Sequence, residues 1–97
     1  MSGGDWKEMY QAAKTGDFNL VRFHLAMGVD PNYQHPEFMT APLMECIRFG
    51  HLEIAKYLLE NGADANAIEH NNTTTAMSIA QMLGNQNAIK LLKQYQE

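Results

Sequence analysis

The sequence is poor in several features that would point to particular classes of protein. Its 97 residues include one cysteine, so no internal disulfide can form, and this usage is typical of a reducing compartment. Lysine and arginine total 7 against 11 aspartates and glutamates, giving a formal net charge of −4, and the basic residues form no cluster. This balance argues against binding to nucleic acid or to an anionic membrane surface.

Long apolar runs are also missing. No stretch approaches the roughly 18 consecutive apolar residues of a membrane helix. The N-terminus, MSGGDWKEMY, lacks the basic segment and apolar core of a secretory signal. The length allows one small domain with one continuous core. We therefore expect a cytoplasmic protein that binds neither nucleic acid nor membrane.

What the sequence does contain is an internal repeat. Gly16, Gly50 and Gly84 are 34 positions apart, and Gly28 and Gly62 share that spacing. Three aligned units in so short a chain indicate a repeat protein, because self-similarity at a fixed period of this length marks stacked supersecondary units.

Within the middle unit, the pattern predicts two helices separated by a glycine turn. Pro42 suits a first helical turn, because its missing N–H has no partner there and its φ is already helical. Gly50 ends this helix, and a second, amphipathic helix from about Leu52 ends before Gly62, where glycine takes a left-handed conformation without strain.

The first unit follows the same plan, with polar residues at the starts of its helices. Asp5 and Glu8 are expected to cap an inner helix that runs to about Thr15. Asp17 is expected to cap an outer helix at 18–27.

The segments between the helix pairs decide between repeat families. Gly28 and Pro42 are 14 positions apart, as are Gly62 and Ala76, and the residues between them read as non-helical. Tetratricopeptide units, whose helices are joined by short turns, leave no room for such segments. The pattern therefore predicts an inner helix, a tight turn, an outer helix and a long extended loop in each unit.

These residues resemble the ankyrin repeat family. APL at 41–43 is similar to that family's TPL motif, and GHLEIAKYLLENGADANA at 50–67 is close to its consensus throughout. The segments AAKTGDFNLVRFHLAMGVDPN at 12–32 and TAMSIAQMLGNQNAIKLL at 75–92 extend the resemblance over nearly the whole chain. The sequence also departs from the family pattern: Tyr10, Met44 and Ser78 replace the histidine usual after TPL. Met39 and Thr73 stand where a hairpin-tip glycine is usual.

The resemblance implies an all-α, ankyrin-repeat solenoid of three stacked helix-turn-helix units with long extended hairpin-like loops between them. We expect a disordered lead-in at 1–4 and a single ankyrin-repeat domain at 5–97, with repeats at about 5–36, 37–70 and 71–97. His24 and Lys93 stand where the middle unit has Leu58 and Leu59. Polar residues facing outward from the end units are typical of a complete, self-capped array.

The resemblance also implies a function, because ankyrin repeats bind other proteins through a concave surface of loop tips and inner helices. The positions that carry over to this chain are Lys14, Thr15, Tyr33, Glu37, Phe38, Thr40, Arg48, Phe49, Asn71, Asn72, Thr74, Met82 and Leu83.

Large apolar groups occupy several of these positions. Phe38, Phe49, Met82 and Leu83, together with Arg48, are expected to form one aromatic-and-arginine patch of the kind that supplies binding hot spots. Two interpretations stay open at this point. The patch is a docking site, or Phe49 and Leu83 fold back over the turn and complete the core.

Two functions follow from the patch. The first is a non-catalytic module that binds an unidentified partner protein and is itself a monomer rather than a homodimer. The alternative is a homo-oligomeric structural protein that pairs through the same patch, since two-fold self-pairing is the commonest oligomer type.

Catalysis and cofactors find little support. The turn glycines lack the lysine and serine of a phosphate-binding loop, and Cys46 lies on the apolar side of a helix, where a thiol is inert. His35 and His70, with Glu37 and Glu69 nearby, match no zinc spacing. We expect no enzyme activity, no cofactor and no metal.

Two polar side chains in the middle unit have simpler interpretations. His51 is expected to serve its local backbone. Glu45 is either solvated or paired with Arg48 at i+3.

Overall fold

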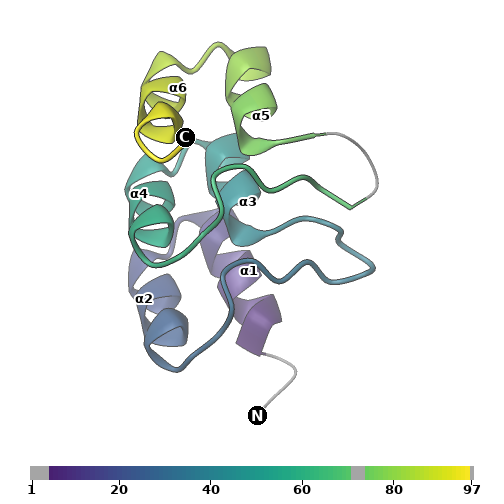
Figure 1. Ribbon diagram of the computed structural model, residues 1–97. Coiled ribbons are helices and arrows are strands. Elements are labelled where there is room, and N and C mark those ends of the chain that lie inside the picture. The colour runs from purple at the N-terminus through teal and green to yellow at the C-terminus, as the bar shows by residue number, and fades with distance from the viewer. Residues whose placement is uncertain (1–4, 71–73, 97) are drawn as a thin grey trace.

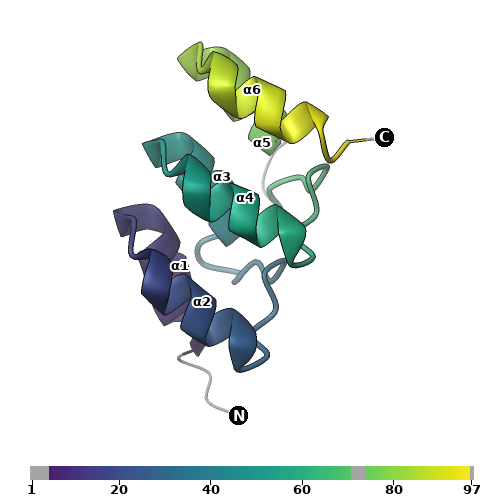
Figure 2. The same cartoon turned by 90° about the vertical axis from the view of Figure 1, so that its left-hand side faces the viewer.

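Helices account for most of the computed structural model, which describes residues 5–70 and 74–96. In these residues an inner row comprises α1 (Asp5–Thr15), α3 (Pro42–Phe49) and α5 (Ala76–Leu83). An outer row comprises α2 (Phe18–Ala26), α4 (Leu52–Glu60) and α6 (Gln86–Lys93). The rows lie side by side in Figure 1, and Figure 2 shows the three helix pairs stacked one above the next. This is the predicted three-unit solenoid. The expected lead-in at 1–4 lies outside the described residues.

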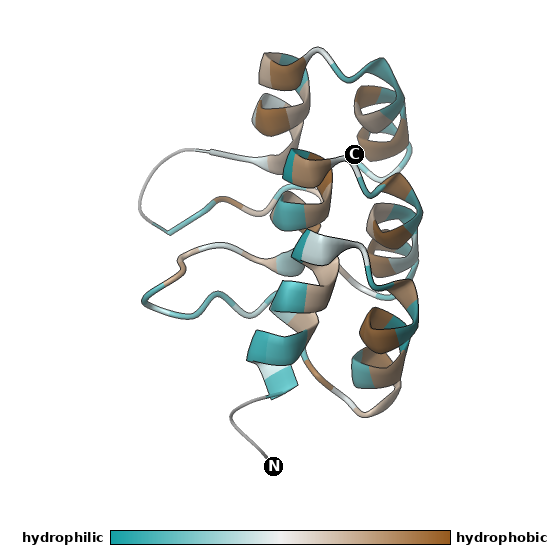
Figure 3. Cartoon of the chain, turned by 180° about the vertical axis from the view of Figure 1, so that it is seen from behind, coloured by the Kyte–Doolittle hydropathy of each residue, from teal (hydrophilic) through white to brown (hydrophobic). Residues whose placement is uncertain are grey.

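The core lies between the two rows and runs through all three units. Met9 and Val21 are buried in the first unit, Ile47 and Leu58 in the second, and Leu92 in the third. Each of the helices carries apolar segments in Figure 3. Because one helix pair cannot bury its apolar face alone, each unit depends on its neighbour for removal of that surface from water.

Glycines end the inner helices as the sequence predicts. Gly50 follows α3 with φ 82°, and Gly84 follows α5 with φ 68°. At the outer helices, Asp17 accepts from the N–H of Leu20 at 3.2 Å, which confirms the predicted cap of α2. The equivalent position of α6, Asn85, caps in the same way.

Two inner-helix starts differ from expectation. Asp5 lies inside the first turn of α1, and the Glu8 carboxylate bonds the imidazole of His24, so the expected capping pair is not seen. The start of α5 has a capping box that sequence inspection missed. Thr75 Oγ1 accepts from the N–H of Ser78, and Ser78 Oγ accepts from the N–H of Thr75.

His24 was expected to face outward, and that expectation is wrong. Its side chain lies between α1 and α2 with its Nε2 2.7 Å from Oε1 of Glu8, and the residue is only 3% exposed. The carboxylate offers this buried imidazole a partner that a purely apolar interface lacks. Lys93 is exposed, although Leu59 in the preceding unit is buried.

Hydrogen bonds join each extended loop to the next. Asn32 Nδ2 donates to the carbonyl oxygen of Gly62 at 2.9 Å, and Asn32 Oδ1 accepts from the N–H of Asp64 at 2.7 Å. Nearer the loop tips, the N–H of His70 donates to the carbonyl oxygen of Met39. A single antiparallel bridge, Ile68–Thr75, is the hairpin-like pairing in the described residues. The loops therefore project together on one side of the inner row (Figure 1).

None of the helices in residues 5–70 and 74–96 has the length and apolar character needed to cross a membrane.

Candidate protein-binding surface

The C-terminal ends of the three inner helices lie in register. Since α1 ends at Thr15, α3 at Phe49 and α5 at Leu83, the last two side chains of each helix occupy equivalent positions one repeat apart. We call this set the inner-helix row. Its members are Lys14, Thr15, Arg48, Phe49, Met82 and Leu83.

The apolar members of the inner-helix row face solvent. Phe49 is 51% exposed, Leu83 is 56% exposed and Met82 is 82% exposed. The interpretation in which Phe49 and Leu83 fold back to complete the core is therefore wrong. Each stands directly before the left-handed glycine that ends its helix, where the chain turns towards the outer row.

Lys14 connects the first unit to this apolar surface. Its Nζ lies 5.8 Å from the ring centroid of Phe49, within the range of a cation–π contact. The neighbouring Thr15 is turned to its own helix, because its Oγ1 donates to the carbonyl oxygen of Gln11 at 2.9 Å.

Arg48 is held by two buried carboxylates. Its Nη2 donates to Oε2 of Glu69 at 2.8 Å, and its Nη1 donates to Oε2 of Glu45. Glu45 and Glu69 are 4% and 7% exposed. Burial alone would lower the pKa of the Arg48 guanidinium, but the hydrogen bonds and charges of Glu69 and Glu45 outweigh it and raise that pKa. Of the two alternatives for Glu45, the pairing with Arg48 is confirmed and the solvated one is wrong, whereas the contact with Glu69 was not anticipated.

This ion-pair network changes the role expected for Arg48. Its donors hold the second extended loop, through Glu69, against α3. The side chain of Arg48 is about one-third exposed at 34%, so its edge still contributes positive charge to the row.

Tyr10 lies beside the network. Burial raises the pKa of the Tyr10 hydroxyl; the negative charge of Glu45 raises it further, and that of Glu69 adds to this, while Arg48 opposes them. Its ring stacks on Phe38 with centroids 4.8 Å apart.

Phe38 belongs to a different cluster from Phe49. It packs with the rings of the first loop and of α1, a set that we call the aromatic cluster. Its members are Trp6, Tyr10, Tyr33, His35 and Phe38. Trp6 and His35 stack with centroids 4.3 Å apart.

The single patch expected from the sequence is therefore two surfaces. Phe38 lies in the loop before α3 and contacts the rings of Trp6 and Tyr10, whereas Phe49 is the last residue of α3 and contacts Lys14.

The remaining predicted positions are distributed around these two surfaces. Tyr33 is 42% exposed and Glu37 is exposed at the first loop. Thr40 is buried, at 6% exposure, so its side chain cannot reach a partner and we omit it from the surface. Thr74 is half-buried and its carbonyl oxygen accepts from the N–H of Glu69. Asn71 and Asn72 lie outside the described residues.

The cysteine and histidines have structural surroundings. Cys46 is fully buried and its Sγ donates to the carbonyl oxygen of Pro42 at 3.1 Å. Burial raises the pKa of this thiol, which disfavours the reactive thiolate. His35 stacks on Trp6 and Glu69 pairs with Arg48, and the described residues contain no group of three candidate metal ligands.

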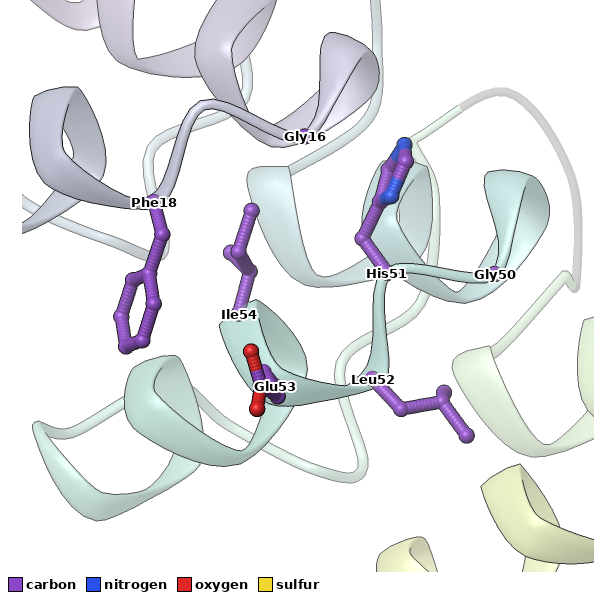
Figure 4. A pocket seen from close by; sticks show the side chains of 7 residues that line it. All are labelled: Gly16, Phe18, Gly50, His51, Leu52, Glu53 and Ile54. Atoms are coloured by element: carbon purple, nitrogen blue, oxygen red, sulfur yellow. The ribbon is translucent and has the colours of Figure 1, made fainter.

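A shallow pocket of about 250 Å³ lies where the first two glycine turns meet (Figure 4). The ring of His51 stands in it, and its Nε2 is 3.1 Å from the carbonyl oxygen of Lys14 in the preceding unit. His51 therefore bonds the backbone as expected, but the expectation that this backbone is local is wrong, because its partner lies 37 residues away.

The fold and the repeat positions define an array of helix pairs that presents its inner helices and loop tips on one flank. The chain belongs to the ankyrin repeat family: residues 9–97 match the family described as ankyrin repeats (3 copies).

Several curated proteins are similar to this chain. The ARF GTPase-activating protein Git of Drosophila melanogaster is 31% identical over 70% of the chain, but the match covers 9% of that protein. An ankyrin repeat and KH domain-containing protein of Caenorhabditis briggsae is 33% identical over 84% of the chain and 3% of its own length. Human Inversin is 31% identical over 88% of the chain and 8% of its own length. The chain thus spans less than a tenth of each of these relatives. Ankyrin repeats are in general protein–protein interaction modules without catalytic activity.

Proposed function

We propose that this chain is a non-catalytic module that binds a partner protein on the inner-helix row and the adjacent loop tips. The observation that carries the proposal is the alignment of Phe49, Met82 and Leu83. All three side chains are more than half exposed, on neighbouring inner helices of one small domain. Clustered exposed apolar groups on a soluble domain favour association, because covering them removes apolar surface from water.

The loop tips extend the same flank. The first loop projects beside the inner helices in Figures 1 and 3, so a partner that lies across the row can also touch this loop. Tyr33, Glu37 and the half-buried Phe38 are the residues that we assign to this second contact. The neighbouring loop adds Thr74 at its edge.

The rigid setting of the row supports binding at low entropic cost. Phe49 and Leu83 each end a helix whose next residue is fixed in the left-handed conformation, and Arg48 ties α3 to the second loop. A surface held in this way loses little conformational freedom on association, which preserves the gain from apolar burial.

Affinity capture from a native lysate tests the proposal with a matched pair of variants. Phe49→Ala is expected to weaken partner capture by about 1–3 kcal/mol, the range of a binding hot spot. Phe23→Ala is the matched control. Phe23 is about as exposed as Phe49, 55% against 51%, but it lies on the outer helix α2 and not on the inner-helix row. The control is expected to bind as the unchanged chain does.

Three outcomes contradict the proposal. Equal loss of partner capture by Phe49→Ala and Phe23→Ala would show that the binding surface is not the inner-helix row. Unfolding of Phe49→Ala, seen by circular dichroism, would make Phe49 a core residue. Light scattering tests for self-association. If the mass of the unchanged chain rises with concentration and Phe49→Ala restores the mass of a monomer, the row is a self-association surface.

A further inference from the structure

The charges along the inner-helix row differ from those of the rest of the chain. Although the chain has a formal net charge of −4, the exposed charged group of the row is Lys14, supplemented by the one-third-exposed edge of Arg48. The two acidic side chains nearby, Glu45 and Glu69, are buried beneath the surface and both are bonded to Arg48.

Lys14 is the ionic group of the row that remains available. It forms no ion pair with any of the described residues, and its contact is with the face of the Phe49 ring. An ammonium group beside an apolar surface gains more from a carboxylate that a partner brings than it does in open water, because the partner also displaces solvent around the pair.

Exposed carboxylates are placed elsewhere. Glu53 and Glu60 lie on the outer helix α4, and Asp17, Asp30 and Asp64 lie at turns and loops next to the outer row. Two exposed carboxylates lie nearer to the row without belonging to it: Glu8 on α1, which is bonded to His24, and Glu37 in the first loop. A cationic partner would therefore be attracted to the outer face, whereas the inner-helix row suits an anionic one.

From this charge complementarity we infer that the row recognises a partner segment that combines a carboxylate with bulky apolar side chains. The inference rests on the proposed function. The carboxylate pairs with Lys14 over the first unit, and the apolar side chains cover Phe49, Met82 and Leu83 over the second and third units. Because the two kinds of contact lie on successive helices, about 8–10 Å apart, the bound segment has a fixed direction across the solenoid.

Selection from a library of random 12-residue peptides tests the inference. The peptides are selected on the immobilised chain, and those that do not bind the Phe49→Ala variant are sequenced. The expected result is enrichment of peptides that carry Asp or Glu a few residues from Leu, Phe or Trp. A chosen peptide is then measured by fluorescence anisotropy at about 0.05 and 0.15 M salt, because screening weakens an exposed ion pair.

Variants of Lys14 separate its charge from its packing on Phe49. Lys14→Glu is expected to weaken binding of the selected peptide at least about 10-fold, and Lys14→Ala about 3- to 5-fold. Lys14→Arg is expected to bind within about 2-fold of the unchanged chain, since it keeps the charge. Lys56→Glu, a reversal at an exposed position of α4, is the matched control and is also expected to stay within about 2-fold.

The outcomes distinguish this inference from the proposed function. Peptides that bind through Phe49 but lack an acidic residue, or that bind Lys14→Glu as tightly as the unchanged chain, overturn the inference and leave the binding surface in place. Peptides that tolerate both Phe49→Ala and Leu83→Ala, or a selection that enriches no peptide, contradict the proposed surface as well.

Discussion

The imidazole Nε2 of His51 lies 3.1 Å from the backbone carbonyl oxygen of Lys14, so the second glycine turn is bonded to the end of the first inner helix. The same ring occupies the space beside Gly16. A Cβ atom added to Gly16 would lie 2.8 Å from Cε1 of His51, closer than ordinary packing allows. Absence of a side chain at Gly16 therefore allows the first two units to approach, and His51 fills the space between them (Figure 4).

Two glycine substitutions test this packing. Gly16 and Gly50 both have positive φ, 91° and 82°, so alanine is strained at either position by about 1–2 kcal/mol. A Cβ at Gly50 meets nothing within 4 Å, whereas one at Gly16 displaces His51. We expect Gly16→Ala to lower the free energy of unfolding by about 1 kcal/mol more than Gly50→Ala, because the bond from His51 is also lost. Urea unfolding followed by circular dichroism measures the difference.

A double-mutant cycle with His51→Ala identifies the cause. If displacement of the ring explains the extra loss, Gly16→Ala and His51→Ala are non-additive by about 0.5–1 kcal/mol. Additive effects would show that the difference between the glycines comes from backbone strain alone.

The Arg48 network gives a second prediction. Arg48→Ala leaves the carboxylates of Glu45 and Glu69 buried without their shared cation. Removing one partner of a fully buried pair costs about 3–5 kcal/mol, and we expect about 2 kcal/mol here because the Arg48 side chain is 34% exposed. Arg22→Ala, at an exposed position of α2 without an ion pair among the described residues, is expected to change stability by less than about 0.5 kcal/mol. Similar urea midpoints for the two variants would contradict the role of the network.

Much of the fold could be predicted because it depends on short-range spacing. The recurrence of Gly16, Gly50 and Gly84 places the turns, and a helix between a turn and a capping residue has little freedom in where it begins and ends. Exposure of Phe49 and Leu83 was left open, since the residue before a helix-ending glycine can point either way until the neighbouring unit is placed.

The contacts that could not be predicted join residues far apart in sequence. Glu69 reaches Arg48 across 21 residues, and Glu8 reaches His24 across 16. Arg48 and Glu8 each lie on a helix, at a position where a charged side chain could equally be solvated. The sequence therefore does not indicate which residue each of them pairs with. The location of Phe38 depends likewise on the path of an extended loop, which has no periodic pattern to indicate its direction.

Met39 provides a third prediction. It has φ 57° and is the one non-glycine residue with positive φ in the described part of the chain. It stands where the family usually has glycine at the hairpin tip. We expect Met39→Gly to be more stable than Met39→Ala by about 1 kcal/mol, because both remove the side chain but only glycine takes this conformation without strain. Equal urea midpoints for the two variants would mean that the loop relaxes away from the left-handed conformation.

The raised pKa of Tyr10 predicts how stability depends on alkaline pH. Burial, with added repulsion from Glu45 and Glu69, raises the pKa of the folded-state hydroxyl above the ordinary 10.0. Above that pH the unfolded chain has lost this proton while the folded chain still holds it, so the unfolded state is favoured. The contribution of Tyr10 to stability is therefore complete below about pH 10 and is lost as the pH rises through the folded-state value. Urea midpoints of the unchanged chain and of Tyr10→Phe, measured between about pH 8 and pH 11, test this.

The comparison with Tyr10→Phe isolates the contribution of this one hydroxyl to the pH dependence of stability. The phenylalanine variant keeps the ring that stacks on Phe38 and lacks only the ionisable hydroxyl. Its midpoint is expected to fall less steeply above pH 10 than that of the unchanged chain. Identical pH profiles for the unchanged chain and Tyr10→Phe would show that neither burial nor the charges of Glu45 and Glu69 raise the pKa of the Tyr10 hydroxyl in the folded state.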